Sequence, residues 1–226
     1  TIGLLIQEIV YRLTGSGDMA MVILFLVYLP GIFIHEGAHW TMAKLLGLKT
    51  GKFRVWPQKK GKYIGMGSVT VNRGGTVRDS LVGMAPLLAG SSLVALIAGQ
   101  VFGADRLAGV WAQGNALDVV TSIFAALAGQ QDGLVWAWAI FAIANAMMPS
   151  ASDREPLKML VLYLVIVGSL YILLDSSGQI FLQAAVWLTG PTRLLVSALI
   201  FTLVIDGVIL AILYIVQVVV ATLQRR

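Results

Sequence analysis

The sequence contains no cysteine, only two histidines and few charged residues. The absence of cysteine excludes a disulfide framework, a Cys-ligated zinc or iron–sulfur centre and a thiol nucleophile. Charged residues make up 12% of the 226 residues, whereas a soluble domain is typically about a quarter charged. Hydrophobic residues make up 58%, and the mean hydropathy is +0.86. This composition excludes an ordinary soluble domain and an intrinsically disordered chain.

Long apolar runs indicate a polytopic membrane protein. Five of them approach the roughly 20 residues that a helix needs to cross the bilayer core. They lie at residues 19–45, 80–102, 133–150, 156–174 and 192–223. We therefore expect an all-α protein with about five transmembrane helices in a lipid bilayer. Two shorter apolar runs, at 117–128 and 179–189, are predicted to be re-entrant or interfacial.

The basic residues are distributed unevenly between the two sides of these spans. If the first span runs from outside to inside, 13 Lys and Arg residues fall inside and 3 fall outside. Such a bias is typical of cytosolic loops, so we expect the N-terminus outside and the C-terminus in the cytosol. The net charge of +5 is explained in this way, and no nucleic-acid partner is expected.

Three regions are predicted along the chain. Residues 1–18 contain apolar side chains at helical spacing and are expected to form an interfacial amphipathic helix. Residues 19–165 form the transmembrane core, with a small membrane-associated β-hairpin at 52–72 whose turn lies at 58–61. Residues 166–226 form a C-terminal transmembrane region.

Both histidines lie in one pentad, His35-Glu36-Gly37-Ala38-His39. Residues four apart share one face of a helix, so both imidazoles can bind a single metal ion. Glu36 is placed to take a proton from a metal-bound water. Zinc held by two His, a carboxylate and a water forms an open catalytic site, in which the pKa of the water falls to about 7. The pattern therefore predicts a zinc site, and the alternative is a polar contact between helices.

The third ligand of such a site must be an oxygen donor, because the chain has no other His and no Cys. Two carboxylates are candidates. Asp153 follows the third apolar run, and Asp206 lies inside the fifth. The sequence leaves both open.

His35, Glu36 and His39 resemble the zinc-binding His-Glu-x-x-His of the site-2 protease family of intramembrane zinc metalloproteases. That family carries a later motif with Asn, Pro and Asp–Gly, and Asn145 and Asp153 match its Asn-to-Asp spacing of eight. The resemblance implies that Asp153 completes the zinc site and that Glu36 is the general base. It also implies that Asn145 helps to position the substrate or the oxyanion.

The chain departs from this family pattern at two positions. Pro149 lies one place late, and Arg154 stands where the family has Gly. The segment at 83–90 resembles the Pro-containing helix that the family places beside the catalytic one, and the hairpin resembles its membrane-associated sheet. The resemblance covers roughly residues 19–165, which would then be a metalloprotease-like core without a PDZ or CBS domain.

The resemblance implies an intramembrane protease of a prokaryotic plasma membrane, with Zn²⁺ as cofactor and its active site towards the cytosol. Its expected partner is a transmembrane protein substrate whose peptide bonds it hydrolyses. The alternative is a catalytically inactive, protease-like subunit that assembles with other subunits of a membrane complex. A transporter is disfavoured, because the charged residues within the spans are too few to form a relay.

Overall fold

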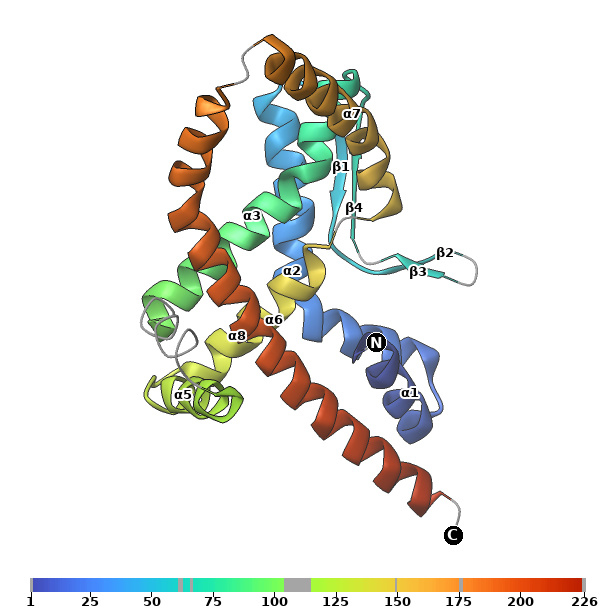
Figure 1. Ribbon diagram of the computed structural model, residues 1–226. Coiled ribbons are helices and arrows are strands. Elements are labelled where there is room, and N and C mark those ends of the chain that lie inside the picture. Colours follow the sequence, from blue (N-terminus) through green and yellow to red (C-terminus); the bar gives the residue numbers. More distant parts are fainter. Residues whose placement is uncertain are drawn as a thin grey trace.

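The computed structural model describes residues 2–60, 63–65, 67–103, 115–148, 150–174 and 177–224. This part of the chain is mostly helical, as predicted (Figure 1). The helices are α1 Ile2–Thr14, α2 Gly17–Leu45, α3 Thr76–Phe102, α5 Ala116–Ala128, α6 Gly133–Ala146, α7 Ala151–Leu174 and α8 Gln179–Leu223.

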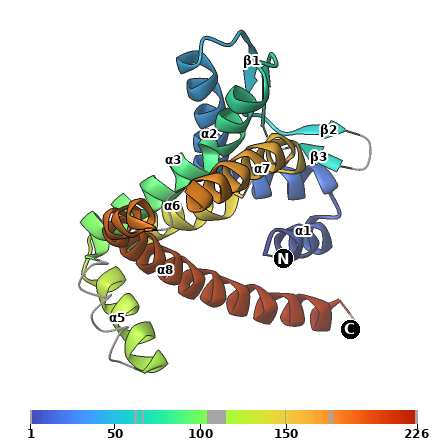
Figure 2. The same cartoon turned by 45° about the horizontal axis from the view of Figure 1, so that its top comes forward.

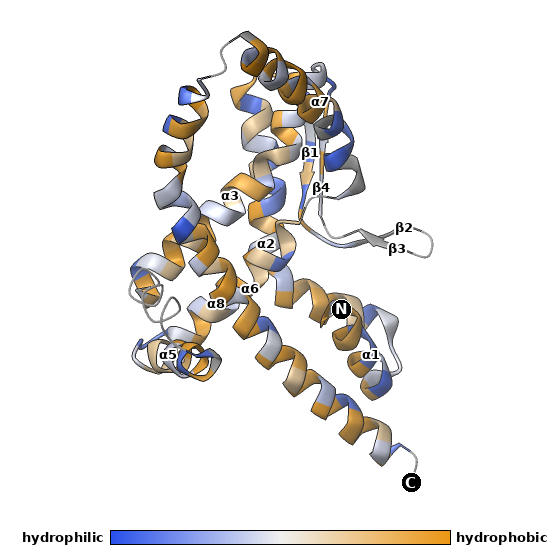
Figure 3. Ribbon diagram, viewed as in Figure 1, coloured by the Kyte–Doolittle hydropathy of each residue, from blue (hydrophilic) through white to orange (hydrophobic). Residues whose placement is uncertain are grey.

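Four of the described helices are long and apolar enough to cross a membrane, namely α2, α3, α7 and α8. Hydrophobic residues, shown in orange, make up most of their ribbons in Figure 3. The predicted span at 133–150 is instead the 14-residue α6, which rises only about 21 Å against a hydrocarbon core of about 30 Å. The predicted separate segment at 179–189 is the first part of the 45-residue α8. The chain is therefore described as a membrane protein with four candidate spans.

The strands form two small antiparallel sheets between α2 and α3. Strand β1 (Thr50–Arg54) pairs with β4 (Ser68–Val71), and β2 (Gln58–Lys60) pairs with β3 (Tyr63–Gly65). Residues 58–60 were predicted to form the turn of the hairpin. They instead form strand β2, because they pair with β3. Residues 61 and 62 lie outside the described residues. Figure 2 shows β2 and β3 projecting from the helices.

The β1–β4 ribbon is held against α2 by aromatic contacts. The ring of Phe53 packs edge-on to Phe33 with centroids 6.1 Å apart, and Trp56 lies 5.1 Å from Phe25. Aromatic pairs at such separations add to the apolar area that they bury. The ribbon therefore lies along the helix that carries the histidine pentad.

Three glycines allow α2 and α3 to approach the segment that runs from the end of α6 to the start of α7 very closely. A Cβ atom added at any of them would meet that segment at less than 3.0 Å, a distance that real Cβ atoms essentially never show. The distances would be 2.0 Å from Gly31 to Ala142 O, 2.5 Å from Gly83 to Asp153 O and 2.7 Å from Gly90 to Met147 Cβ. The absence of a side chain at these positions therefore sets how the helices pack.

Replacing Gly31 by Ala is expected to destabilise the protein, because the new methyl group overlaps the Ala142 carbonyl. Overpacking of this kind costs about 1–3 kcal/mol. Gly37→Ala is the matched control on the same helix, because no atom beyond its own stretch of helix lies within 4 Å of its added Cβ. Thermal unfolding in detergent should show a lowered midpoint for Gly31→Ala only. Equal midpoints for the two variants would contradict the close contact.

The last turns of α8 lie beside α1. Gln217 Nε2 donates to the Glu8 carboxylate at 3.0 Å, and Gln224 Nε2 donates to the backbone oxygen of Arg12 at 2.6 Å. Hydrogen bonds from Arg12 and then from Gln217 hold the pKa of the Glu8 carboxyl below its usual range. The predicted topology separated the two ends, with the N-terminus outside and the C-terminus cytosolic. The structure does not support that separation, because it brings the end of α8 to α1.

Cysteine labelling is expected to place both ends on one side of the membrane. Leu13 and Leu223 are both exposed, and the chain has no native cysteine to add background. Leu13→Cys and Leu223→Cys should react with an impermeant maleimide from the same side. Lys49→Cys, beyond the other end of α2, should react from the opposite side. Labelling of Leu223→Cys together with Lys49→Cys would restore the opposite-side topology.

Candidate metal centre

His35, His39 and Asp153 form a cluster that can hold a metal ion. The two histidine Nε2 atoms are 3.2 Å apart. The Asp153 carboxylate lies 3.4 Å from His39 Nε2 and 3.9 Å from His35 Nε2. Ligand atoms about 2.0–2.1 Å from a tetrahedral zinc ion are about 3.3 Å from one another. The two imidazole nitrogens are thus spaced as two zinc ligands would be, and the Asp153 carboxylate lies close to both, through Oδ1 at His39 and Oδ2 at His35.

Local structure explains how the three side chains meet. His35 and His39 lie one turn apart on α2 and project from the same face. Asp153 belongs to the first turn of α7, where the backbone N–H and hydroxyl of Ser150 donate to its Oδ2 at 2.8 and 2.5 Å. This contact fixes the carboxylate, as hydrogen bonds to metal ligands commonly do.

The ring nitrogens of the histidines also suit a shared cation. His39 Nδ1 donates to the backbone oxygen of Val82 at 2.9 Å, so its Nε2 presents a lone pair. Without a metal, His35 Nε2 must donate to that lone pair, and His35 Nδ1 becomes a bare acceptor. Among the described residues, the buried His35 Nδ1 has no hydrogen-bond partner, and the backbone of Ala146 lies near the His35 ring. With a cation on both Nε2 atoms, His35 Nδ1 carries a proton and can donate to Ala146. The residues therefore fit a bound metal.

Glu36 lies beside the cluster without belonging to it. Its side chain is buried, at 8% exposure. The backbone N–H of Val69 in β4 faces its carboxylate. A Cβ atom at Gly67, where φ is +80°, would lie 2.8 Å from Glu36 Cγ. The start of β4 therefore packs directly on this carboxylate, and the glycine is required for the close approach.

Asp206 does not join the metal cluster. Asn145 Nδ2 donates to Asp206 Oδ1 and to the backbone oxygen of Phe141, in both cases at 3.0 Å. Of the two carboxylates that the sequence left open, Asp153 is therefore the one that the structure brings to the histidines. Asp206 instead forms a pair with Asn145.

A single cavity of about 1090 Å³ connects these groups. Its walls include the three cluster residues, Glu36, Asn145 and the outer edge of β4. Sequence reasoning missed Ser150, although Ser150-x-x-Asp153 before an apolar run is a capping-box pattern. It also missed Gly67 and the backbone of Val69, for which the sequence carries no local signal. Pro149 lies outside the described residues, and Arg154 Nε donates to the Ser150 carbonyl at 3.4 Å.

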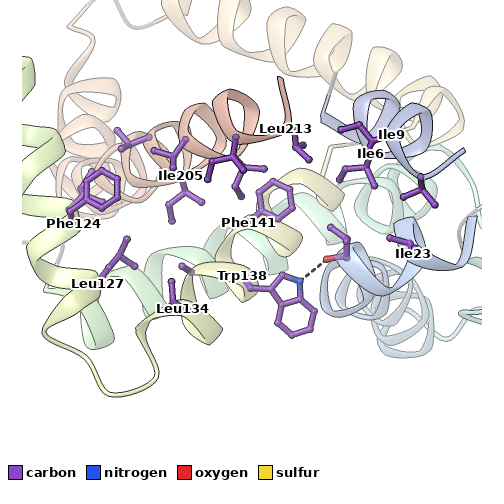
Figure 4. A pocket seen from close by; sticks show the side chains of 18 residues that line it. Ile6, Ile9, Ile23, Phe124, Leu127, Leu134, Trp138, Phe141, Ile205 and Leu213 are labelled. Atoms are coloured by element: carbon purple, nitrogen blue, oxygen red, sulfur yellow. Dashed lines mark hydrogen bonds between the residues drawn. The ribbon is translucent and has the colours of Figure 1, made fainter. Parts of the chain in front are cut away.

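A second cavity, of about 580 Å³, lies between α1, α2, α5, α6 and α8 (Figure 4). No acidic, basic or histidine side chain is among the residues that line it. Its one polar contact is a hydrogen bond from Trp138 Nε1 to the Val27 backbone oxygen at 2.8 Å. Tyr28, which lines the first cavity, stacks on Phe141, which lines the second, with ring centroids 5.5 Å apart. The acidic and histidine side chains of the metal cluster therefore border the first cavity and not the second.

Comparisons with protein-family models, curated proteins and solved structures gave no match to this chain. The chemistry that the site can support is therefore inferred from its own geometry.

Proposed function

We propose that the protein is an intramembrane zinc metalloprotease of the site-2 protease type, which hydrolyses peptide bonds of membrane-embedded substrates. The observation that carries this proposal is the convergence of His35, His39 and Asp153, whose nearest side-chain N and O atoms lie 3.2, 3.4 and 3.9 Å apart. Glu36 and Asn145 line the same cavity as these three residues. The five residues that match the family's two motifs therefore border one space.

The donor set favours zinc over other ions. Two imidazoles and one carboxylate are a usual ligand set for catalytic zinc, whereas magnesium and calcium prefer oxygen ligands alone. When bound, zinc supplies a Lewis acid that polarises the scissile carbonyl and acidifies a water molecule.

Glu36 would act as the general base. It takes a proton from the attacking water and passes it to the leaving amine, which is the proton transfer that peptide hydrolysis requires. Its burial and the N–H of Val69 restrict the carboxylate to one position beside the cluster. That position follows from its place next to His35 on α2.

An extended substrate would bind along β4. Carbonyl groups of an intact transmembrane helix are hydrogen-bonded, so the scissile segment must first unwind. Among the described residues, β4 pairs only with β1, and Val69 and Val71 on β4 line the cavity. A segment added to this free edge would pair with β4 by β-augmentation, close to Glu36.

The depth and orientation of the site support cleavage within the membrane. His35 precedes the end of α2 by ten residues, which is about 15 Å along the helix axis. The basic loop that follows α2 is typical of a cytosolic connection. We therefore infer that the site lies within the bilayer, towards its cytosolic side.

Metal analysis together with a cleavage assay tests this function. The purified protein is expected to carry about one zinc ion per chain and to cleave a transmembrane test peptide. A chelator should stop the cleavage, and added zinc should restore it. A purified protein without zinc would contradict the proteolytic function. It would favour the second candidate, an inactive protease-like subunit of a membrane complex, to which the Arg154 departure from the family pattern points.

A further inference from the structure

We propose that Asp206 is a positioning residue for the cleavage reaction. It turns the Asn145 amide so that Asn145 offers its carbonyl oxygen, and not an N–H group, to the substrate. This inference rests on the proposed function and specifies how the same site holds its substrate. Asp206 itself is not among the residues that line the cavity, so it acts through Asn145.

The hydrogen bonds of Asn145 fix which end of its amide faces which way. Its Nδ2 lies 3.0 Å from both the Phe141 backbone oxygen and Asp206 Oδ1. A backbone carbonyl and a carboxylate oxygen both accept, so the NH₂ group must face them. An amide nitrogen has two hydrogens, and each is used by one of these acceptors. Asn145 therefore has no free donor.

The atom that remains is Asn145 Oδ1. Asn145 lines the cavity that contains the metal cluster. Its Oδ1 is not among the buried, unpartnered side-chain atoms of the described residues. Asn145 thus presents an acceptor to whatever occupies the cavity.

This polarity decides between two roles for Asn145. Stabilising an oxyanion requires a donor. Asn145 could supply one only by breaking a hydrogen bond, such as the part-buried one to Asp206, which costs free energy. Accepting a hydrogen bond from a backbone N–H of the substrate requires no such change. An extended substrate would then be held between β4 on one side and Asn145 Oδ1 on the other. A proline at the contacted position, which lacks this N–H, would be disfavoured.

Binding of modified peptides tests the inference without turnover. In the Glu36→Gln protein, the affinity of a transmembrane test peptide is compared with a series in which one backbone N–H at a time is replaced by an ester oxygen. One ester near the scissile bond should weaken binding about fivefold, the effect of one hydrogen bond. Asn145→Ala and Asp206→Ala should abolish this discrimination. Asp206→Asn should keep it, because an amide oxygen also accepts from Nδ2.

Gln217→Ala is the matched control, because it removes a different hydrogen bond of α8, to Glu8 on α1. It should keep the discrimination. In the active protein, Asp206→Ala should raise KM about fivefold with little change in kcat. The inference is overturned if Asp206→Ala still discriminates against the ester, or if it lowers kcat at an unchanged KM, as loss of an oxyanion donor would. Zinc-loaded wild-type protein that cleaves no peptide would instead overturn the proposed function itself.

Discussion

The Glu36→Gln protein is expected to retain its zinc and to lose cleavage of a transmembrane test peptide almost completely. Glutamine nearly matches glutamate in shape and can keep the contact with the Val69 N–H through its amide oxygen. It cannot take a proton from water. General acid–base catalysis contributes about 10²–10⁴-fold to the rate. The cleavage rate should therefore be lower than the wild-type rate by a factor in that range.

The measurement is single-turnover cleavage in detergent or liposomes, with the zinc content of the same samples determined by mass spectrometry. Glu8→Gln is the matched control, because Glu8 lies on α1 and does not line the cavity. It should cleave at the wild-type rate. Wild-type cleavage by Glu36→Gln would remove Glu36 from the mechanism, even if zinc were bound.

Asp153→Ala is expected to lose zinc, whereas Asp206→Ala is expected to keep it. The Asp153 carboxylate lies at the two histidine Nε2 atoms, while Asp206 is paired with Asn145. Losing a partner that merely orients a ligand weakens metal binding about 10–100-fold. Removing the ligand itself should exceed that range, because only the two histidines of α2 remain.

Zinc retained against a competing chelator distinguishes the two variants. Both proteins should also be compared by thermal unfolding, so that metal loss is separated from misfolding. Zinc loss in Asp206→Ala together with retention in Asp153→Ala would show that Asp206 is the ligand. Retention in both variants would show that two histidines suffice, and would contradict the three-ligand site.

The sequence predicted those parts of the site that depend on local geometry. The relation of His35 to His39 needs only the helical repeat, and the helix is specified by the apolar run around it. The third ligand could not be chosen, because Asp153 and Asp206 are distinguished by the packing of α7 and α8 and not by spacing along the chain. The role of β4 at Glu36 depends on the same kind of long-range contact.

The number of candidate spans differs from the predicted number for a different reason. Apolar content does not show where a helix begins or ends. The apolar run at 133–150 is interrupted when α6 ends at Ala146 and a new helix begins at Ala151. Conversely, the apolar runs at 179–189 and 192–223 were predicted to be separate segments, yet α8 continues through Gly190 and Pro191 between them. Proline is tolerated in membrane helices when neighbouring groups satisfy the freed backbone.

The three close glycine contacts have a consequence for how this site can vary. Gly31, Gly83 and Gly90 set the distance from α2 and α3 to the segment that carries Asn145 and Asp153 by contact with its backbone and Cβ atoms. These contacts therefore set the geometry of the metal centre, and the rotamers of the surrounding apolar side chains do not. Lipid-facing positions are thus free to drift in evolution, while these three positions, far apart in the sequence, are constrained together.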